Sequence, residues 1–137
     1  MNPTILLVDD DGDFVLLVEC ALKKSRLGAS LQYVLDGEEA ISYLSRQGKF
    51  NDENTFPAPA LVLLDLKMPR IGGFEVLQWK SSRPELSKIP FVVFSSSDLE
   101  RDKKQAAELG ARDYLAKPMV FSDLMEIVAT LQRFWVD

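Results

Sequence analysis

The sequence contains no histidine and only one cysteine, Cys20, in 137 residues. Without histidine the chain cannot build a Ser-His-Asp or Cys-His nucleophilic site or a histidine-ligated metal site, and it cannot itself carry a phosphohistidine. A single cysteine cannot form an internal disulfide, which agrees with a reducing compartment. Because Cys20 falls in a predicted helix, we expect it to be a small, buried apolar side chain rather than a reactive thiol.

The chain also lacks long apolar runs, a leader pattern and an excess of positive charge. No run approaches the roughly 18 apolar residues of a membrane span, and residues 1–4 lead directly into the first strand without the pattern of a signal peptide. The net charge is −5, whereas DNA binding requires a basic face. We therefore expect a cytoplasmic protein of one domain that binds neither a membrane nor nucleic acid.

Short, fully apolar runs are the main feature that the sequence does contain, and they are typical of strands buried on both faces of a parallel sheet. A helical pattern follows each run. The alternation predicts an α/β fold, with a doubly wound parallel sheet covered by helices on both faces. The predicted strands cover residues 5–8, 30–35, 61–64, 91–94 and 111–116, and the helices cover about 11–26, 36–44, 74–83, 98–109 and 124–135.

Three segments carry more detailed expectations. The first helix should begin after an N-cap at Asp11 and bury one apolar stripe. Residues 48–59 are polar, contain two prolines and show no periodicity, which predicts a long surface loop. The helix at 98–109 has few large apolar residues and should be loosely held. The expected stripe of the first helix consists of Phe14, Leu17, Val18, Ala21 and Leu22.

Polar residues follow four of the predicted strands, at the point where each strand ends. Asp9 and Asp10 follow the first strand, Asp65 the third, Ser95 the fourth and Lys117 the fifth. The carboxyl ends of parallel strands share one edge of a sheet, so we expect these side chains to meet. Three clustered carboxylates repel one another, and a divalent cation relieves that repulsion. Oxygen ligands of this kind suit Mg²⁺, and the added lysine and serine could hold a phosphoryl group.

Each of these residues also has an ordinary structural explanation. Asp65 could accept hydrogen bonds from the following turn, and Asp9 and Asp10 could neutralise a helix N-terminus. Ser95 alone would be a turn residue, and Lys117 alone a solvated surface charge. Their joint occurrence at matching strand ends favours a functional site.

Together the motifs resemble the receiver domain of two-component response regulators. They are Asp9-Asp10, Asp65 with Met68-Pro69 and Gly73 after it, Ser95, and Lys117-Pro118. The resemblance implies a flavodoxin-like (βα)5 fold with strand order 2-1-3-4-5, present as a single receiver domain over residues 1–137 with no output domain. The long loop before the third strand and the end of the chain at Trp135 most resemble stand-alone receivers paired with bacterial phytochrome histidine kinases.

The resemblance also implies a mechanism. Asp65 would accept a phosphoryl group from the phosphohistidine of a sensor histidine kinase or a histidine phosphotransfer protein. Mg²⁺ would be bound by Asp10 directly, by Asp9 through water, by Asp65, and by the backbone carbonyl of Lys67. Lys117 and Ser95 would hold the phosphoryl oxygens. The protein would then be a signalling phosphoprotein that catalyses only its own phosphorylation and dephosphorylation, not an enzyme acting on other substrates.

Further expectations from the resemblance concern switching. Ser95 and Tyr114 would be the switch residues, and the fourth helix, fifth strand and fifth helix would form the output face for an unknown downstream protein. A cis peptide at Lys117-Pro118 is compatible with the family. Phe134 and Trp135 are expected to pack in the core, with a homodimer interface as the alternative. Two positions, Gly72 and Lys67, depart from the commonest receiver pattern, and Lys67 places a cation near the site.

Other functions fit less well. A Mg²⁺-dependent phosphatase of the haloacid-dehalogenase type needs a second aspartate two residues after its nucleophile, where this chain has Lys67. A flavodoxin would need a phosphate-binding loop where Asp9, Asp10 and Asp11 stand. A calcium loop fails because Phe14 occupies the position of the required glycine. A receiver-fold adaptor that is never phosphorylated remains open.

Overall fold

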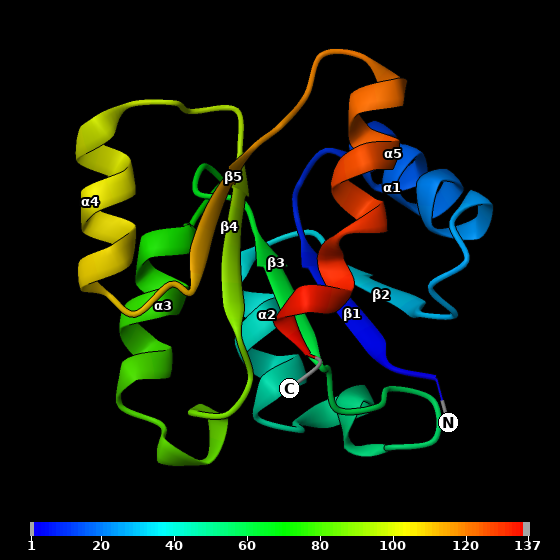
Figure 1. Cartoon of the computed structure of the whole chain (residues 1–137). Coiled ribbons are helices and arrows are strands. Elements are labelled where there is room, and N and C mark those ends of the chain that lie inside the picture. The colour runs from blue at the N-terminus through cyan, green and yellow to red at the C-terminus, as the bar shows by residue number, and fades with distance from the viewer. Residues whose placement is uncertain (1, 136–137) are drawn as a thin grey trace.

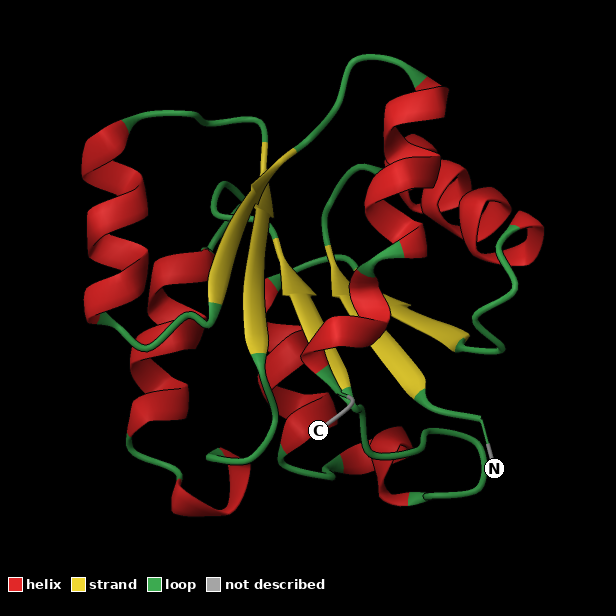
Figure 2. Cartoon of the chain, in the orientation of Figure 1, coloured by secondary structure: helices red, strands yellow, loops and turns green. Residues whose placement is uncertain are grey.

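Five parallel strands form the centre of the structure, a computed structural model that describes residues 2–135. The strands lie in the order β2-β1-β3-β4-β5, and all neighbouring pairs are parallel, with the arrowheads of Figure 2 pointing the same way. This confirms the flavodoxin-like fold and the strand order expected from the resemblance. The strands are β1 (Thr4–Val8), β2 (Ser30–Val34), β3 (Leu61–Leu64), β4 (Phe91–Ser95) and β5 (Asp113–Ala116).

Helices cover both faces of the sheet (Figure 1). One apolar cluster joins the sheet to α1 and α5, and a second joins the opposite face to α2, α3 and α4. Every residue of β1, β3 and β4 is buried, which explains why these strands are apolar, except for Thr4 at the start of β1 and Ser95 at the end of β4, rather than alternating. The helices are α1 (Gly12–Lys24), α2 (Gly37–Leu44), α3 (Gly73–Ser81), α4 (Glu100–Glu108) and α5 (Phe121–Ala129), with short 3-10 turns η1 (Gly48–Asn51), η2 (Pro84–Leu86) and η3 (Leu131–Phe134).

The first helix begins as predicted but is rotated relative to the expected stripe. The Asp11 side chain accepts hydrogen bonds from the backbone of Asp13 and Phe14, so it is the N-cap. The buried residues are Phe14, Val15, Val18, Ala21 and Leu22. At 100° per residue, Leu17 lies roughly 100° from the centre of this stripe and Cys20 roughly 160°. The predictions that Leu17 and Cys20 are buried were therefore wrong: both are exposed.

The segment 48–59 is more structured than the sequence indicated. It contains η1, and Phe50 within it is buried against Tyr43 and Phe56, with ring centroids about 5 to 6 Å apart. The Tyr43 hydroxyl donates to the carbonyl of Pro57 at 2.6 Å. Aromatic packing therefore holds this connection, although its polar residues are exposed as expected.

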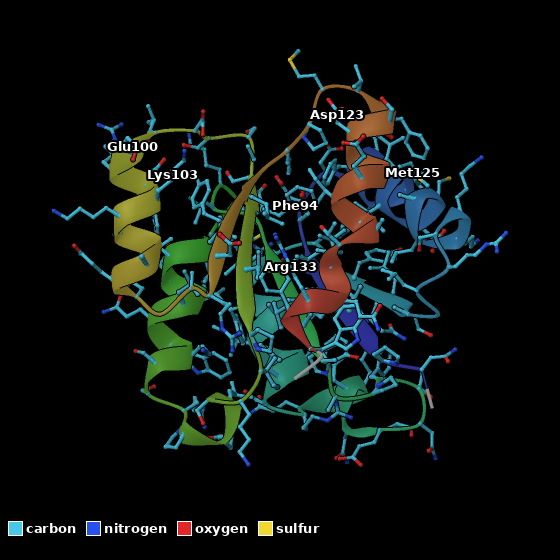
Figure 3. The ribbon with its side chains drawn as sticks, viewed as in Figure 1. Phe94, Glu100, Lys103, Asp123, Met125 and Arg133 are labelled. Carbon is cyan, nitrogen blue, oxygen red and sulfur yellow. The ribbon has the colours of Figure 1, made fainter. Side chains whose placement is uncertain are left out.

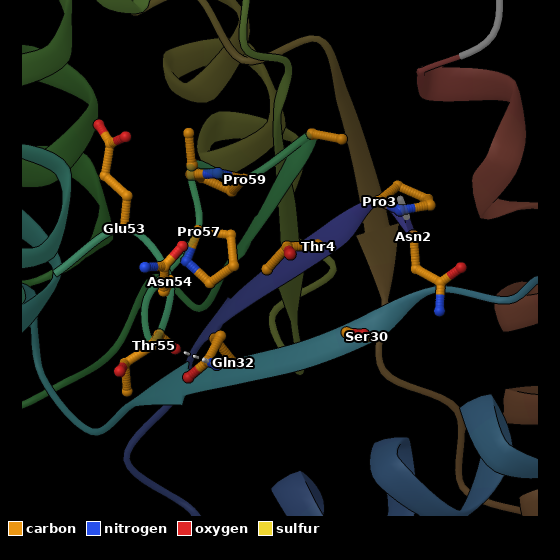
Figure 4. A pocket seen from close by; sticks show the side chains of 12 residues that line it. Asn2, Pro3, Thr4, Ser30, Gln32, Glu53, Asn54, Thr55, Pro57 and Pro59 are labelled. Carbon is orange, nitrogen blue, oxygen red and sulfur yellow. Dashed lines mark hydrogen bonds between the residues drawn. The ribbon is translucent and has the colours of Figure 1, made fainter.

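A hollow lies beside this segment, between the amino ends of β1 and β2 and residues 53–60 (Figure 4). It measures about 750 Å³. Gln32 spans it by donating from Nε2 to the carbonyl of Thr55 at 3.1 Å, the dashed line of Figure 4. The hollow is at the opposite end of the strands from the predicted site.

Two further observations concern the whole described chain. No peptide bond in residues 2–135 is cis, so the Lys117-Pro118 bond is trans, contrary to the cis form that the resemblance allowed. The trans form is the intrinsically favoured one, by about 0.5–1 kcal/mol for a bond before proline. None of the described helices has the length and apolar character needed to cross a bilayer.

Candidate functional site

Three carboxylates meet at the carboxyl ends of β1 and β3. Backbone bonds extend the sheet to them: the Asp9 amide donates to Val34 and the Asp65 amide to Val8. Asp9 is fully buried and Asp65 is 6% exposed, whereas Asp10 is exposed. One carboxylate oxygen from each of Asp9, Asp10 and Asp65 lies within 4.8 Å of the others. The structure thus brings together the three acidic residues that the sequence placed at one rim.

A lysine from the end of β5 reaches into this cluster. The Lys117 Nζ lies 2.7 Å from Asp9 Oδ2 and 3.5 Å from Asp65 Oδ2, and its side chain is 14% exposed. Its backbone amide donates to the carbonyl of Ser95, which fixes the register of this segment against β4. The ammonium also sits 4.4 Å from the centroid of the Phe14 ring, a favourable cation–π geometry. The Phe14 ring therefore helps to position the Lys117 ammonium, a role that the sequence did not reveal.

Burial and charge oppose one another in this site. Burial raises the pKa of the Asp65 carboxyl, and the neighbouring Asp9 raises it further, although Lys117 acts in the opposite direction. Burial by itself would lower the pKa of Lys117, but the paired carboxylates of Asp9 and Asp65 outweigh it, and the pKa is raised. The lysine is therefore held in its charged form, while the Asp65 carboxylate lacks full compensation in the protein alone.

The loop after β4 connects the predicted switch residues. Ser95 is fully buried, and its Oγ accepts from the backbone amide of Ser97 at 3.2 Å. The Tyr114 hydroxyl donates to the carbonyl of Ser97 at 2.7 Å. Ser97 in turn donates from Oγ to Asp102 on α4 at 2.5 Å. Sequence reasoning missed Ser97 as a junction, although the run of three serines after β4 was a visible signal.

Glycine permits the close turn after β3. A side chain at Gly73 would overlap the carbonyl of Asp65 and the Cα of Leu66. Gly72 donates its amide to Glu75 Oε1 at 3.1 Å and so closes the first turn of α3. Lys67 is exposed, and its backbone amide bonds to Asp65. The turn therefore packs directly beneath the Asp65 backbone.

The arrangement has the properties of a site for a hard cation and a phosphoryl group. Three carboxylates supply oxygen donors at close range, and hard divalent cations such as Mg²⁺ prefer such donors. One exposed carboxylate, Asp10, leaves the cluster open to solvent on one side. Lys117 adds a fixed positive charge beside Asp65. Residues 2–135 thus contain a donor set that fits a divalent cation.

Comparisons with known proteins agree with this geometry. The family model for the response regulator receiver domain matches residues 5–129. Response regulator Rcp1 of Synechocystis sp. is 38% identical over 99% of this chain and 92% of its own length. The crystal structure of the phosphorylated cyanobacterial phytochrome response regulator RcpA superimposes with a TM-score of 0.88, at 35% identity, covering 98% of this chain and 94% of RcpA. The Mn²⁺-bound form of Rcp1 gives a TM-score of 0.84 at 36% identity, covering 98% and 95% of the two chains.

Proposed function

The chain belongs to the response regulator receiver domain family, and from this premise we propose that it is a stand-alone response regulator phosphorylated on Asp65. The observation that carries the proposal is the cluster of Asp9, Asp10 and Asp65 with Lys117 2.7 Å from one of its members. Coverage of 92% of Rcp1 supports a single receiver domain over residues 1–137.

In the proposed reaction an oxygen of Asp65 attacks the phosphorus of a phosphohistidine on the partner. The P–N bond breaks, the histidine leaves, and an acyl phosphate forms on Asp65. Phosphoryl transfer passes through a loose transition state, so the site acts through positioning and charge neutralisation. Lys117 would pair with a phosphoryl oxygen, and the Ser95 hydroxyl would donate to another.

We propose Mg²⁺ as the cation, held directly by Asp10, Asp65 and the backbone carbonyl of Lys67, and by Asp9 through water. When bound, it would neutralise charge on the carboxylates and on the phosphoryl oxygens. The support is the oxygen-only donor set, which suits Mg²⁺, together with the existence of a Mn²⁺-bound form of the relative Rcp1.

We also propose that Ser95 and Tyr114 act as the switch. A phosphoryl group on Asp65 would recruit the Ser95 hydroxyl, which now accepts from the amide of Ser97. The Tyr114 hydroxyl donates to the carbonyl of Ser97, and Ser97 donates to Asp102 on α4. A shift of the loop at Ser97 would therefore move both β5 and α4. The output face would then be α4, β5 and α5, of which α4 has only Ala106 buried.

The partner is proposed to be a sensor histidine kinase of the phytochrome type, because RcpA is a phytochrome response regulator, or a histidine phosphotransfer protein. Large apolar side chains are exposed on two segments that begin at the site: Leu17 on α1, and Met119 and Val120 between Lys117 and α5. They could receive apolar side chains of the partner. Leu17→Glu should then slow transfer from the kinase while leaving labelling by a small donor unchanged.

Acetyl phosphate with Mg²⁺, followed by intact mass measurement, tests the proposal most directly. The native protein should gain the mass of one phosphoryl group, and Asp65→Asn should gain none. No mass gain in the native protein under any donor would favour the alternative, a receiver-fold adaptor that is never phosphorylated. Light scattering before and after phosphorylation tests self-association through the output face. The cytoplasmic location remains a prediction.

A further inference from the structure

A second charged feature lies at the opposite end of the sheet from the phosphorylation site. The amino ends of β3, β4 and β5 enclose a pocket of about 320 Å³, which we call the amino-edge pocket. Its charged lining residues are Lys88 before β4, Arg112 before β5, and Arg133 in η3. Phe134 and Trp135 complete one wall. Figure 3 labels Arg133 on this last helical turn.

The part of the chain that the structure describes compensates little of the positive charge of the amino-edge pocket, although the chain as a whole carries −5. Among the described residues, Lys88 and Arg112 form no ion pair, and Arg133 reaches only Asp113, at 3.6 Å and half exposed. Such an exposed pair contributes little. Burial and the charge of Arg112 lower the pKa of nearby Lys80. Within residues 2–135, the positive charges that line the pocket therefore outnumber the negative charges paired with them.

Helix dipoles do not explain this cluster. Basic residues are favoured in the last turn of a helix, which accounts for Lys80 at the end of α3. Lys88 and Arg112, however, lie in connections that precede strands, and Arg133 lies in a four-residue 3-10 turn. Three cations from separate segments thus converge on a pocket without a helix-capping reason.

An aromatic contact holds one of these three cations in place. The guanidinium of Arg133 lies 4.7 Å from the centroid of the Phe134 ring, within the range of a cation–π contact. Phe134 and Trp135 are half-buried and pack against the cluster under α1 and α5. The pocket therefore pairs a partly ordered arginine with exposed parts of two aromatic rings.

We propose that the amino-edge pocket binds a small molecule that carries a phosphate group, with Lys88, Arg112 and Arg133 around the phosphate and Phe134 and Trp135 against a planar apolar part. Guanidinium groups match phosphate oxygens with paired, forked hydrogen bonds. Three cations around one pocket suit the charge of a phosphate better than that of a single carboxylate. The volume lies at the lower end of that of small-ligand sites. This inference is independent of phosphorylation at Asp65, because the two sites occupy opposite ends of the strands.

Titration of the ¹⁵N-labelled full chain, without divalent cation, tests the proposal with two probes. Inorganic pyrophosphate tests the phosphate contact alone, and adenosine 5′-monophosphate tests phosphate with a planar ring. We expect saturable shifts of the Arg112 and Arg133 amides with both probes. The nucleotide should also shift the Trp135 indole N–H. Binding of pyrophosphate without the nucleotide would overturn the role given to Phe134 and Trp135.

Matched variants identify where the probe binds. Arg112→Gln should weaken binding about tenfold or more, since it removes one charged hydrogen-bond partner, whereas Lys104→Gln on exposed α4 should leave binding unchanged. Both variants should keep the dispersed amide spectrum of the native protein, which shows that they are folded. Asp65→Asn should bind the probes like the native protein. The proposal would be overturned if Arg112→Gln bound the probes as tightly as the native protein, or if the titration gave no saturable shift. Shifts confined to residues around Asp10 would also overturn it.

Discussion

Among single residues, Lys117 and Asp9 form the closest ion pair of the site. Asp9 is fully buried, and its Oδ2 lies 2.7 Å from the lysine ammonium. A buried carboxylate that loses its cation retains the desolvation cost without the attraction that offset it. The pair therefore matters for folding of the metal-free protein, and Lys117 has a second, proposed role in holding the phosphoryl group.

Replacing the lysine should reveal both roles. We expect Lys117→Met to lower the free energy of unfolding of the metal-free protein by about 3 kcal/mol and to prevent stable labelling by acetyl phosphate. Mg²⁺ should recover part of the stability, because it supplies the missing positive charge. Urea unfolding with and without Mg²⁺ measures this. Lys104→Met, on an exposed residue of α4, is the control and should change the stability by less than about 0.5 kcal/mol.

The raised pKa of Asp65 predicts a pH dependence of stability. A carboxyl whose pKa is higher in the folded state than in the unfolded chain binds protons more tightly when folded. Its contribution to stability is therefore lost as pH rises from the unfolded pKa, about 3.9, through the folded pKa. Metal-free Asp65→Asn should accordingly be more stable than the native protein at pH 7, with the difference vanishing below about pH 4. Urea unfolding across this range would contradict the prediction if the variant were less stable at pH 7.

Elements differ in how firmly they are held. The start of α3 packs against the backbone beneath Asp65, with no room for a side chain at Gly73. By contrast, α4 has a single buried residue, Ala106, and its first turn is held by polar contacts, Ser97 with Asp102 and Lys103 with Asp98 at 2.8 Å. Figure 3 shows Lys103 and Glu100 together at this end of α4. The connection after β3 is thus a tightly packed turn, whereas the connection after β4 leads into a loosely packed helix.

Gly73→Ala tests the rigid turn. The added Cβ meets the Asp65 carbonyl, so we expect a loss of about 1–3 kcal/mol in the free energy of unfolding. Gly12→Ala at the first residue of α1 is a matched control, because no atom lies within 4 Å of the position of its added Cβ. That variant should be neutral or more stable by up to about 1 kcal/mol. Equal stability of the two variants would contradict the close packing of α3.

Amide hydrogen exchange tests the loosely packed helix. The amides of α4 should exchange faster than those of α1, whose five buried residues anchor it to the sheet. Ser97→Ala should accelerate exchange in the first turn of α4 further, because it removes the hydroxyl that donates to Asp102. Protection of α4 equal to that of α1 would show that contacts other than burial hold it.

For the whole molecule, the distribution of charge matters more than the net value of −5. Acidic groups gather at the carboxyl ends of the strands, and the amino-edge pocket gathers basic ones. A cation that binds only the folded chain stabilises all of it by mass action. The acidic rim therefore links metal binding to global stability.

Mg²⁺ at a hundredfold excess over its dissociation constant should raise the free energy of unfolding by about 2.7 kcal/mol. Asp10→Asn should remove most of this gain and, because Asp10 is exposed, should leave the metal-free protein folded. Asp13→Asn, an exposed aspartate outside the three-carboxylate cluster, should keep the gain. Thermal unfolding with and without Mg²⁺ measures the effect, and an equal gain in both variants would place the cation elsewhere.

The sequence alone determined the fold and the membership of the acidic rim. Strands buried on both faces are largely apolar, so residues 5–8, 61–64 and 91–94 of β1, β3 and β4 were visible as continuous runs. Asp9 and Asp65 directly follow their strands and Ser95 ends β4, so the order of residues alone assigned all three to the carboxyl edge of the sheet. These features depend only on which residues are neighbours in the sequence.

Only the tertiary structure decided which side chains meet. Whether Leu17 or Val15 faces the sheet depends on how α1 is rotated against α5, and the exposure of Cys20 follows from the same rotation. The contact of Lys117 with Asp9 and Phe14, and the junction at Ser97, join segments far apart in the chain. The amino-edge pocket likewise exists only because three connections end at the same place. The packing of helices and connections against the sheet determines which of these side chains meet. A local sequence pattern contains no information about contacts between segments that are far apart in the chain.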